Sequence, residues 1–484
     1  MLIYINKYLK TLLFIMIASV SNVHAAERSK IGLVLSGGGA RGIAHIGVLK
    51  ELERQRIPID YITGTSMGSI IGALYASGHS IAEIEEILAE IDWLDIFADA
   101  PPRRNASIRR KFDDDIFQVS RELGFKDGKI KIPSGLIRGQ KLQLLLDKLF
   151  LHTANTNNFD QLGIPFRAVA TDIATGQPVV LGDGSLATAI RASMSVPGAF
   201  TTVKHQGYTL VDGGISNNMP VDVARQMGAD VVIAVDIGSP LLEDDSLETF
   251  LGVTLQMTNM LVRNTTQYQI STLVDKDILI VPQLGTYSSS DFEGAGQTIV
   301  KGVEATSNLQ ERLAPLALSE TEMAARSQQR QNKDTLPALI SSVSLNNLSS
   351  FNDQYILSRI SQRLNTELDF DQLELDIGNI YGLGTFESIT YDIVAEQEQS
   401  ELIINVVEKA WGPRYLQFGL RYESQVTNNN ELSGVLGYTV TPLNAFNGEW
   451  RTILQFGEEP GAISELHQPL ARNSSYFLNT NITY

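Results

Sequence analysis

The chain has 484 residues, which is too long for one ordinary hydrophobic core and predicts about two to four domains. Hydrophobic residues make up 43% and charged residues 19%, a globular composition that excludes disorder over the whole length. The net charge of −17 would repel phosphate backbones, so we expect no nucleic acid partner.

Residues 1–25 have the pattern of a secretory signal peptide. Lys7 and Lys10 precede the apolar run Thr11–Val20, and small residues flank His24 before a cleavage site expected after Ala25 or one residue later. The run is shorter than the ~20 residues that cross a bilayer, so a membrane anchor is the weaker interpretation. Because the chain has no cysteine and its six histidines show no ligand spacing, we expect no disulfide, no cofactor and no metal ion.

Residues 30–318 alternate short apolar runs with helical stretches. This alternation predicts an α/β fold with a mostly parallel sheet and helices on both faces, whose ligands bind at the carboxyl ends of the strands. The segment 94–139 interrupts the pattern as an irregular insertion, and its arginine cluster suits either anionic headgroups or solvent. The expected strands are Ile31–Leu35, Ile59–Thr63, Phe166–Ala170, Val179–Leu181, Tyr208–Val211, Val231–Asp236 and Ile278–Val281.

A glycine-rich stretch, Gly-Gly-Gly-Ala-Arg-Gly at 37–42, follows the first strand and opens a helix. Glycines there let backbone amides approach an anion at a helix N-terminus. The stretch also satisfies the dinucleotide pattern G-x-G-x-x-G, so on its own it suits a pyrophosphate as well as an oxyanion. A dinucleotide enzyme would need an acidic residue at the end of the second strand, whereas Asp60 begins it.

A second glycine-rich turn, 64–68, places Ser66 between Gly64 and Gly68, again between a strand and a helix. Flanking glycines permit the sharp turn that lifts a serine hydroxyl clear of the backbone. Such turns also occur in α/β proteins without catalysis. A dinucleotide enzyme has no need of a second one, so the pair of motifs favours acyl transfer with Ser66 as nucleophile.

The base for this serine is predicted to be Asp212, which ends a strand and precedes Gly213 and Gly214. Hydrolases usually supply a histidine after the serine and the acid. The histidines after Ser66 stand at 79, 152, 205 and 467, and none occupies a comparable turn. A buried carboxylate with a raised pKa can accept the serine proton directly.

The remaining third of the chain divides into three segments of different composition. Residues 319–337 are rich in Gln, Ser, Arg and Glu, which predicts a linker or a polar terminal helix. Residues 338–409 predict a small α+β module in the order β-α-α-β-β. Residues 411–484 alternate large apolar with polar residues in runs that suit the ~10-residue strands of a membrane barrel, or else an ordinary antiparallel sheet.

The three motifs, in this order and spacing, resemble the patatin-like phospholipases over residues 30–318. Further similar segments are Ala170–Gly176, Arg191–Gly198 and Asp291-Phe292. The resemblance implies a lipid acyl hydrolase with a Ser–Asp dyad and no histidine. It implies that Ser66 is the nucleophile and Asp212 the base, that the amides of Gly37, Gly38 and Gly39 form the oxyanion hole, and that Arg41 and Gly42 are substrate-binding candidates.

The later segments add to this resemblance. The stretch 380–388 is similar to the turn between the second helix and second strand of POTRA domains. Patatin, POTRA and barrel together resemble patatin-type autotransporters of Gram-negative outer membranes, which implies export to the outer membrane or cell surface and a lipid or phospholipid substrate in a membrane. Residues 411–484 supply only five or six strands where a barrel needs about eight, so we expect a truncated sequence.

Two other functions stay open from the sequence. One is an outer-membrane POTRA and barrel protein that translocates client chains, with an inert N-terminal passenger. The other is a dinucleotide-binding oxidoreductase. Loss of Ser66 would leave the first unchanged, and the second would need the missing acidic residue at the end of its second strand.

Overall fold

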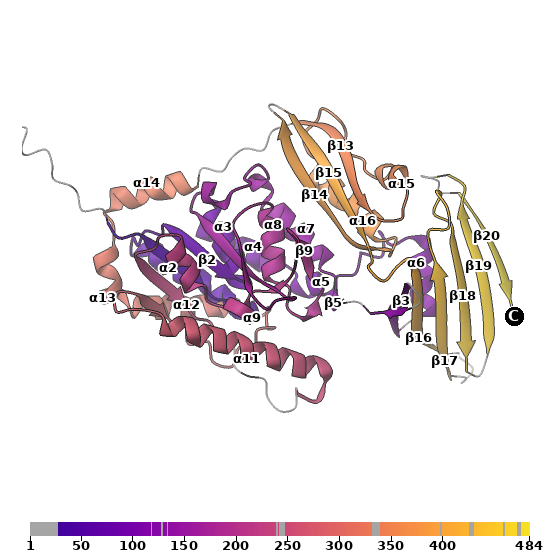
Figure 1. Cartoon of the computed structure of the whole chain (residues 1–484), viewed down its shortest axis with the longest axis horizontal. Coiled ribbons are helices and arrows are strands. Elements are labelled where there is room, and N and C mark those ends of the chain that lie inside the picture. Colours follow the sequence, from indigo (N-terminus) through magenta and orange to yellow (C-terminus); the bar gives the residue numbers. More distant parts are fainter. Residues whose placement is uncertain are drawn as a thin grey trace, which may run out of the picture.

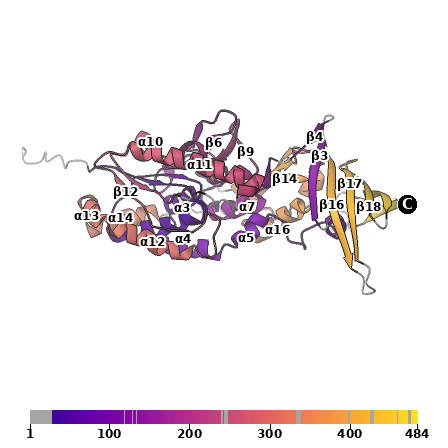
Figure 2. The same ribbon diagram turned by 90° about the horizontal axis from the view of Figure 1, so that it is seen from below.

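The computed structural model describes residues 28–484 except 118, 127–128, 133, 239–240, 242–246, 332–338, 397–398, 425–429, 458–459 and 472–475. The predicted signal peptide lies outside the described residues. A large α/β domain, a small α+β module and a C-terminal antiparallel sheet are arranged along the molecule (Figures 1 and 2). None of the described helices is long and apolar enough to cross a membrane.

The α/β domain is built on a sheet of eight described strands in the order β12-β11-β1-β2-β6-β10-β9, with β7 also paired to β6. Neighbours from β12 to β6 run parallel, whereas β7, β9 and β10 pair antiparallel. The sheet is therefore mixed, and the predicted parallel arrangement holds for its β12-to-β6 part. The strands are β1 (Ile31–Leu35), β2 (Tyr61–Thr65), β6 (Phe166–Asp172), β7 (Pro178–Leu181), β9 (Val203–His205), β10 (Tyr208–Asp212), β11 (Val231–Val235) and β12 (Ile278–Ile280).

Helices cover both faces of this sheet. Leu33 and Leu35 of β1 pack in the main core with α2, α3 and α4, while Val34 packs on the opposite face with α10. Figure 2 shows α10 and α11 on one side of the sheet and α4 and α12 on the other. A strand covered on both faces is apolar throughout, as β1 is. The helices here are η1 (Gly39–Ile43), α2 (Ala44–Arg54), α3 (Met67–Ala76), α4 (Ile81–Glu90), α7 (Gln140–Leu149), η2 (Leu151–Thr153), η3 (Phe159–Gln161), α8 (Leu186–Ser193), α9 (Gly214–Asn217), α10 (Val221–Gln226), α11 (Phe250–Ser271), α12 (Gly296–Ser307), α13 (Gln310–Leu313) and η5 (Ala314–Leu316).

Much of the stretch expected as a linker or polar helix is a helix, α14 (Glu320–Arg330). Ser319 and Glu322 start it with a capping box. The Arg330 guanidinium donates to the carbonyl oxygens of Tyr75 and His79 at 3.1 and 2.6 Å. The helix is thus bound to the α/β domain, and residues 332–337 of the expected linker lie outside the described residues.

The segment 94–139 was predicted to be irregular, and this prediction is wrong. Its strand β3 pairs antiparallel with β16 of the C-terminal sheet. On α6, the buried Arg109 forms ion pairs with Glu449 at 2.9 Å and Glu465 at 2.7 Å, so it faces carboxylates of that sheet. The insertion therefore ties the α/β domain to the C-terminal sheet. Its elements are α5 (Trp93–Ala98), α6 (Ile108–Ile116), β3 (Val119–Lys126), β4 (Lys129–Lys131) and β5 (Gly135–Ile137), the last paired with β8 (Gly198–Phe200).

The small module has its elements in the predicted order, whereas the C-terminal sheet also includes two strands of the insertion. The small module is a three-stranded sheet, β13-β15-β14, with two helices. The C-terminal part is an open seven-stranded antiparallel sheet of described strands, β20-β19-β18-β17-β16-β3-β4. Their elements are β13 (Leu339–Leu348), α15 (Asp353–Leu357), α16 (Phe370–Tyr381), β14 (Phe386–Glu396), β15 (Gln399–Glu408), β16 (Arg414–Ser424), β17 (Asn430–Val440), β18 (Glu449–Phe456), β19 (Gly461–Pro469) and β20 (Phe477–Thr483).

Candidate active site

Ser66 lies in a strained turn between β2 and α3. Its backbone has φ 53° and ψ −125°, a conformation that residues other than glycine rarely adopt. The neighbouring glycines leave no room for a side chain: a Cβ on Gly64 would lie 2.6 Å from the Gly68 carbonyl oxygen, and one on Gly68 would lie 2.3 Å from that of Leu35. The turn therefore depends on both glycines, as the sequence predicts.

Asp212 reaches this turn because β10 stops at the level of Ser66. Thr65 pairs with Val169 of β6, and Asp212 pairs with Ala170, the next residue along that strand. Since β10 runs antiparallel to β6, it enters from the carboxyl edge of the sheet and ends on the far side of β6 from Ser66. The register of three strands thus brings serine and aspartate together.

The Asp212 carboxylate is buried and hydrogen-bonded. One oxygen accepts from the backbone N–H of Gly214 at 2.8 Å. Burial raises the pKa of Asp212 to about 6, and the Gly214 N–H and the nearby Ser66 side chain oppose that rise. A carboxylate with this pKa is ionised near neutral pH and is a better proton acceptor than an exposed aspartate.

The end of α8 and the residues that follow it hold both Ser66 and Asp212. The Ser193 hydroxyl accepts from the backbone N–H of Ser66 at 2.9 Å and donates to the carbonyl oxygen of Val169 at 2.6 Å. Two residues on, the carbonyl oxygen of Ser195 accepts from the backbone N–H of Asp212 at 2.9 Å. Ser193 is thus a positioning residue that the sequence did not identify by role, although Arg191–Gly198 had stood out as a similar segment.

The glycine-rich stretch lies beside Ser66, with its three glycines in different settings. A Cβ on Gly37 would lie 3.0 Å from the Cβ of Ser66, while the Gly37 amide donates to the carbonyl oxygen of Asn218 at 3.3 Å. Within the described part of the chain, no acceptor is found for the amides of Gly38 and Gly39. Of the predicted oxyanion donors, Gly38 and Gly39 are therefore the two with unused N–H groups.

The loop after β12 fixes the position of this stretch. Gly39 has φ 57°, and a Cβ there would lie 2.2 Å from the carbonyl oxygen of Ser289. The same oxygen accepts from the Ala40 N–H at 2.8 Å. A Cβ on Gly42 would lie 2.3 Å from the side chain of Met67, the residue after the serine. Gly42 thus permits close packing of η1 on α3, a structural use in place of the predicted contact with substrate.

Arg41 does not face a substrate site. Its buried guanidinium donates to the carbonyl oxygens of Ile237, Gly285 and Tyr287 at 2.9, 3.3 and 2.6 Å. Burial lowers its pKa, with a smaller opposing effect from Asp236. The predicted role of a substrate-facing cation is therefore corrected: Arg41 joins η1 to the loops that follow β11 and β12.

Among the described residues, no histidine is one of the groups that shift the pKa of Asp212, which are Gly214 and Ser66. His205 pairs with Tyr208, four residues before Asp212 along β10 and hence about 13 Å away. The buried His45 bonds the carbonyl oxygen of Ser36 at 2.9 Å, and burial lowers its pKa to about 4. The role of Asp212 as the base for Ser66 stays a prediction at this point.

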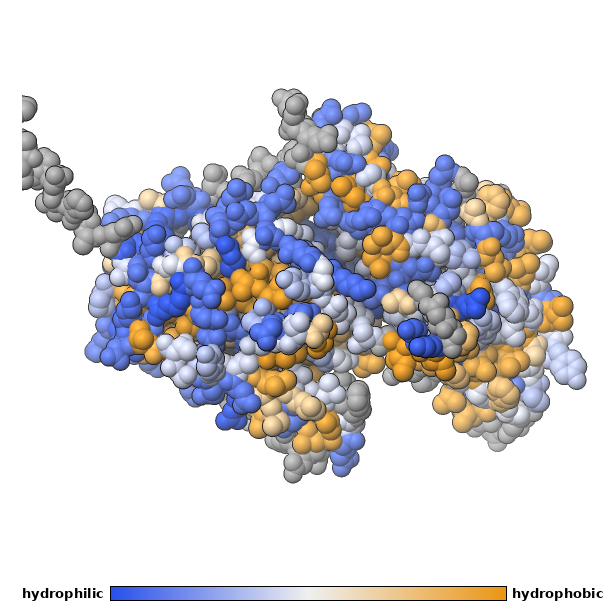
Figure 3. Space-filling view, viewed as in Figure 1, coloured by the Kyte–Doolittle hydropathy of each residue, from blue (hydrophilic) through white to orange (hydrophobic). Residues whose placement is uncertain are grey.

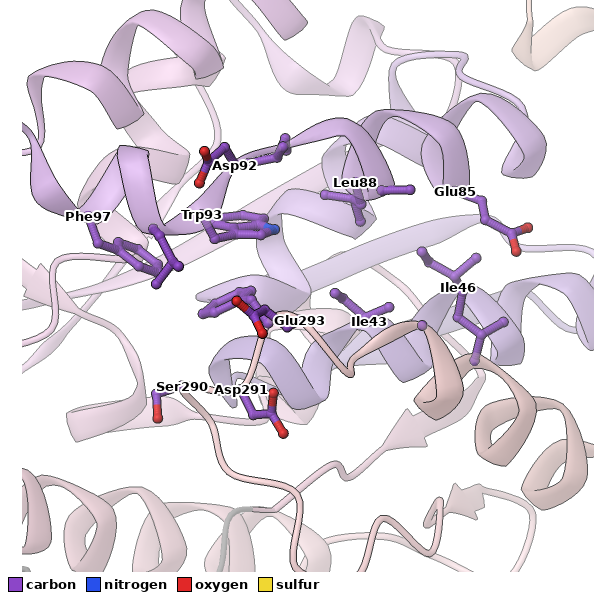
Figure 4. A pocket seen from close by; sticks show the side chains of 16 residues that line it. Ile43, Ile46, Glu85, Leu88, Asp92, Trp93, Phe97, Ser290, Asp291 and Glu293 are labelled. Atoms are coloured by element: carbon purple, nitrogen blue, oxygen red, sulfur yellow. The ribbon is translucent and has the colours of Figure 1, made fainter. Parts of the chain in front are cut away.

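An elongated cavity of about 560 Å³ adjoins the glycine-rich stretch (Figure 4). Ile43 at the end of η1 and Ser290, the neighbour of Ser289, both line it. Neither Ser66 nor Asp212 is among its lining residues. Most of the wall is apolar, and Trp93 stacks on Phe292 at 4.5 Å between ring centres. Such a lining suits a hydrocarbon chain.

The acidic residue that a dinucleotide site would use lies elsewhere. Asp60 precedes β2, at the end of the sheet opposite Ser66, and accepts from the backbone N–H of Ile31 at 2.8 Å and from Arg326 at 2.8 Å. Its carboxylate therefore holds the start of β1 and α14. This position offers no contact to a ribose bound near the glycine-rich stretch.

Comparison with known proteins agrees with this geometry. The sequence profile described as patatin-like phospholipase matches residues 33–225, which include both Ser66 and Asp212. The chain contains a patatin-like phospholipase domain. Its α/β fold, with a mixed sheet and helices, is patatin-like, and an antiparallel sheet follows at the C-terminal end.

Several known proteins are similar to part of this chain. Patatin-like phospholipase domain-containing protein 6 from Mus musculus is 35% identical over 222 residues, 46% of this chain and 14% of that protein. Lysophospholipase nte1 from Aspergillus fumigatus is 34% identical over 228 residues, 46% of this chain and 13% of that protein. The chain thus spans only 13 to 14% of these relatives. The crystal structure of VipD from Legionella pneumophila is 16% identical, with a TM-score of 0.35, over 62% of this chain and 74% of VipD.

Proposed function

We propose that this protein hydrolyses carboxylic esters of lipids, with Ser66 as nucleophile and Asp212 as general base. The observation that carries the proposal is the strand register that brings Ser66, in its strained turn, to the end of β10, where burial raises the pKa of the Asp212 carboxyl to about 6. A serine hydroxyl must lose its proton as it attacks, and a positioned base accelerates such a step by typically ~10²–10⁴. The patatin-like domain supports the assignment of this chemistry to lipids.

The reaction proceeds in two steps. The Ser66 oxygen attacks the ester carbonyl while Asp212 accepts its proton; the alcohol then leaves with a proton returned by Asp212, and an acyl-serine remains. In the second step water attacks the acyl-serine while Asp212 accepts a proton from the water, and Asp212 returns that proton to the serine oxygen as the fatty acid leaves. The same carboxylate serves both steps because the register of β10 holds it beside Ser66.

Backbone amides stabilise the negative oxygen that develops in each step. In the part of the chain that the structure describes, no acceptor is found for the N–H groups of Gly38 and Gly39, and the bond from the Ala40 N–H to Ser289 holds the loop that carries them. Gly37 joins them only if its 3.3 Å bond to Asn218 opens. Each such donor typically contributes ~10²–10³ in rate.

The acyl chain of the substrate is placed in the apolar cavity beside η1. Its volume of about 560 Å³ lies in the usual range for ligand pockets. One relative is named a lysophospholipase, which suggests single-chain phospholipids as the first substrates to test. Phospholipids and other lipid esters form the wider class.

Export and attachment to the outer membrane belong to the proposal as well. The signal-peptide pattern of residues 1–25 supports export, and the resemblance of 338–409 to POTRA domains supports a periplasmic position for that module. The strands β16 to β20 carry exposed aromatic and aliphatic side chains, including Phe418, Tyr422 and Ile482, which favour a lipid environment. Cell fractionation of the expressed chain tests this part: recovery in the soluble cytoplasmic fraction would contradict it.

The test of the activity compares the full chain with Ser66→Ala on a lysophospholipid, a diacyl phospholipid and a short-chain nitrophenyl ester. The full chain is the right protein because β3 of the α/β domain is a strand of the C-terminal sheet. We expect hydrolysis by the parent protein and none above background by Ser66→Ala. Equal turnover by a well-folded Ser66→Ala protein would contradict the proposal. It would favour a translocation protein whose N-terminal domain is an inert passenger.

A further inference from the structure

Helix α11 has two faces of different character. Its inner face binds the catalytic loop: the Thr265 hydroxyl donates to the carbonyl oxygen of Gly214 at 3.1 Å, and Thr266 accepts from the Asn218 side chain at 3.0 Å. A Cβ on Gly214 would lie 2.9 Å from Val262. The helix that carries these side chains thus supports the backbone two residues after Asp212.

The outer face of α11 exposes a hydrophobic stripe. At 100° per residue its exposed hydrophobic side chains fall within an arc of about 100°, which also includes the exposed polar residues Asn264 and Ser271. A stripe of this kind on a helix exposed to water marks a surface for a partner or a membrane. In Figure 3 hydrophobic surface gathers at the lower edge of the molecule, where Figure 1 places α11. The stripe consists of Val253, Met257, Met260, Leu261 and Tyr268, which are 45, 61, 52, 45 and 69% exposed.

The charge of the helix selects among occupants. Arg263 is the one charged residue among the 22 of α11, in a chain of net charge −17. Because α11 has so little charge, it gains little from anionic headgroups and loses little hydration when it enters the surface of a zwitterionic bilayer. The stripe also runs along a single straight helix, which fits the plane of a bilayer interface.

We propose that the outer face of α11 lies in the surface of a lipid bilayer and carries the catalytic loop to its substrate. The occupant is a membrane of zwitterionic phospholipids. This inference rests on the proposed function, because a lipid hydrolase must meet its substrate at the membrane surface. The binding itself is independent of catalysis and can be measured without it.

The absence of cysteine from the chain permits a local test. Met257→Cys carries a polarity-sensitive fluorophore on the stripe, and Val300→Cys carries it on α12, at a valine that is 56% exposed. Both are measured in the full chain with vesicles of phosphatidylcholine and phosphatidylethanolamine. A local probe is needed because the C-terminal sheet also exposes apolar side chains and could bind the vesicles itself.

We expect a blue shift, and quenching by brominated lipid, at position 257 and not at position 300. An unchanged spectrum at 257 in vesicles that bind the protein would overturn the proposal. A blue shift at 257 that rises with protein concentration in the absence of lipid would also overturn it, because a second copy of the chain would then cover the stripe.

Activity gives a second readout with a matched pair of charge variants. Met257→Asp should lower hydrolysis of vesicle substrate by about tenfold, from the loss of one buried apolar side chain, and leave hydrolysis of a soluble short-chain ester unchanged. Val300→Asp should change neither rate. Equal loss in both charge variants would contradict the proposal. If the parent protein hydrolyses no ester, the proposed function fails while the fluorescence result still decides the inference.

Discussion

Replacement of the proposed base, Asp212→Asn, should abolish activity and stabilise the protein at the same time. Burial raises the pKa of Asp212 from 3.8 to about 6. Each pKa unit corresponds to ~1.4 kcal/mol, so the ionised carboxylate lowers the stability of the folded state by about 3 kcal/mol above pH 6. Asparagine keeps the shape and an oxygen for the Gly214 N–H, and it has no charge to bury.

The pH dependence of this effect has a defined sign. Between the unfolded pKa of 3.8 and the folded pKa of about 6 the folded state binds more protons than the unfolded state. Stability conferred by the wild-type carboxyl group is therefore lost as the pH rises through this window. The difference between variant and parent should be about 3 kcal/mol at pH 8 and less than about 1 kcal/mol at pH 4, because all other groups titrate alike in both proteins.

Thermal unfolding of the α/β domain at several pH values measures this difference. At ~2–4 °C per kcal/mol, the variant should unfold roughly 6–12 °C above the parent at pH 8. Its turnover should fall by orders of magnitude, since an amide does not accept the serine proton. A variant that is less stable than the parent at pH 8, or that keeps wild-type turnover, would refute the reasoning.

Three further predictions concern other residues of the site. His205→Gln should retain most of kcat/KM, and a loss as deep as that of Asp212→Asn would indicate a triad. This control is decisive because a carboxylate of pKa about 6 and an imidazole titrate too close together to separate in a pH–rate profile. Ser193→Ala removes the acceptor of the buried Ser66 N–H and should lower kcat about tenfold with KM nearly unchanged, in steady-state kinetics; an unchanged kcat would contradict its positioning role. Leu88→Trp places a larger side chain in the cavity beside η1 and should slow hydrolysis of long-chain esters but not of short-chain esters. An equal loss of activity on both esters would contradict the proposal that the acyl chain binds in this cavity.

The nucleophile turn was predictable from sequence because its cause is local. Gly64 and Gly68 are needed for backbone contacts within a few residues of Ser66 and with β1, and both appear beside the serine in the chain. Asp212 was identified by its position at a strand end and by similarity. Its pairing with Ser66 depends on β10 running antiparallel to β6, which the assumption of a mostly parallel sheet missed.

Residues that act through distant contacts were not predictable in the same way. Arg41 looked like a cation for substrate, but its carbonyl acceptors lie 196 to 246 positions later in the chain. The supporting roles of Ser193 and Asn218 also exist only once the strands are in register.

The insertion shows the same limit on a larger scale. Arg109 seemed suited to headgroups or solvent, and its partner Glu449 is 340 residues away.

The central claim is that Ser66 is the nucleophile, and covalent labelling tests it most directly. A fluorophosphonate probe reacts with a serine that is activated by a base, and peptide mass spectrometry locates the adduct. We predict a single adduct on Ser66 in the full chain, and none in Asp212→Asn within the same labelling time. An adduct on Ser36, Ser193 or Ser195, or no adduct in a folded protein that hydrolyses lipid esters, would contradict the account.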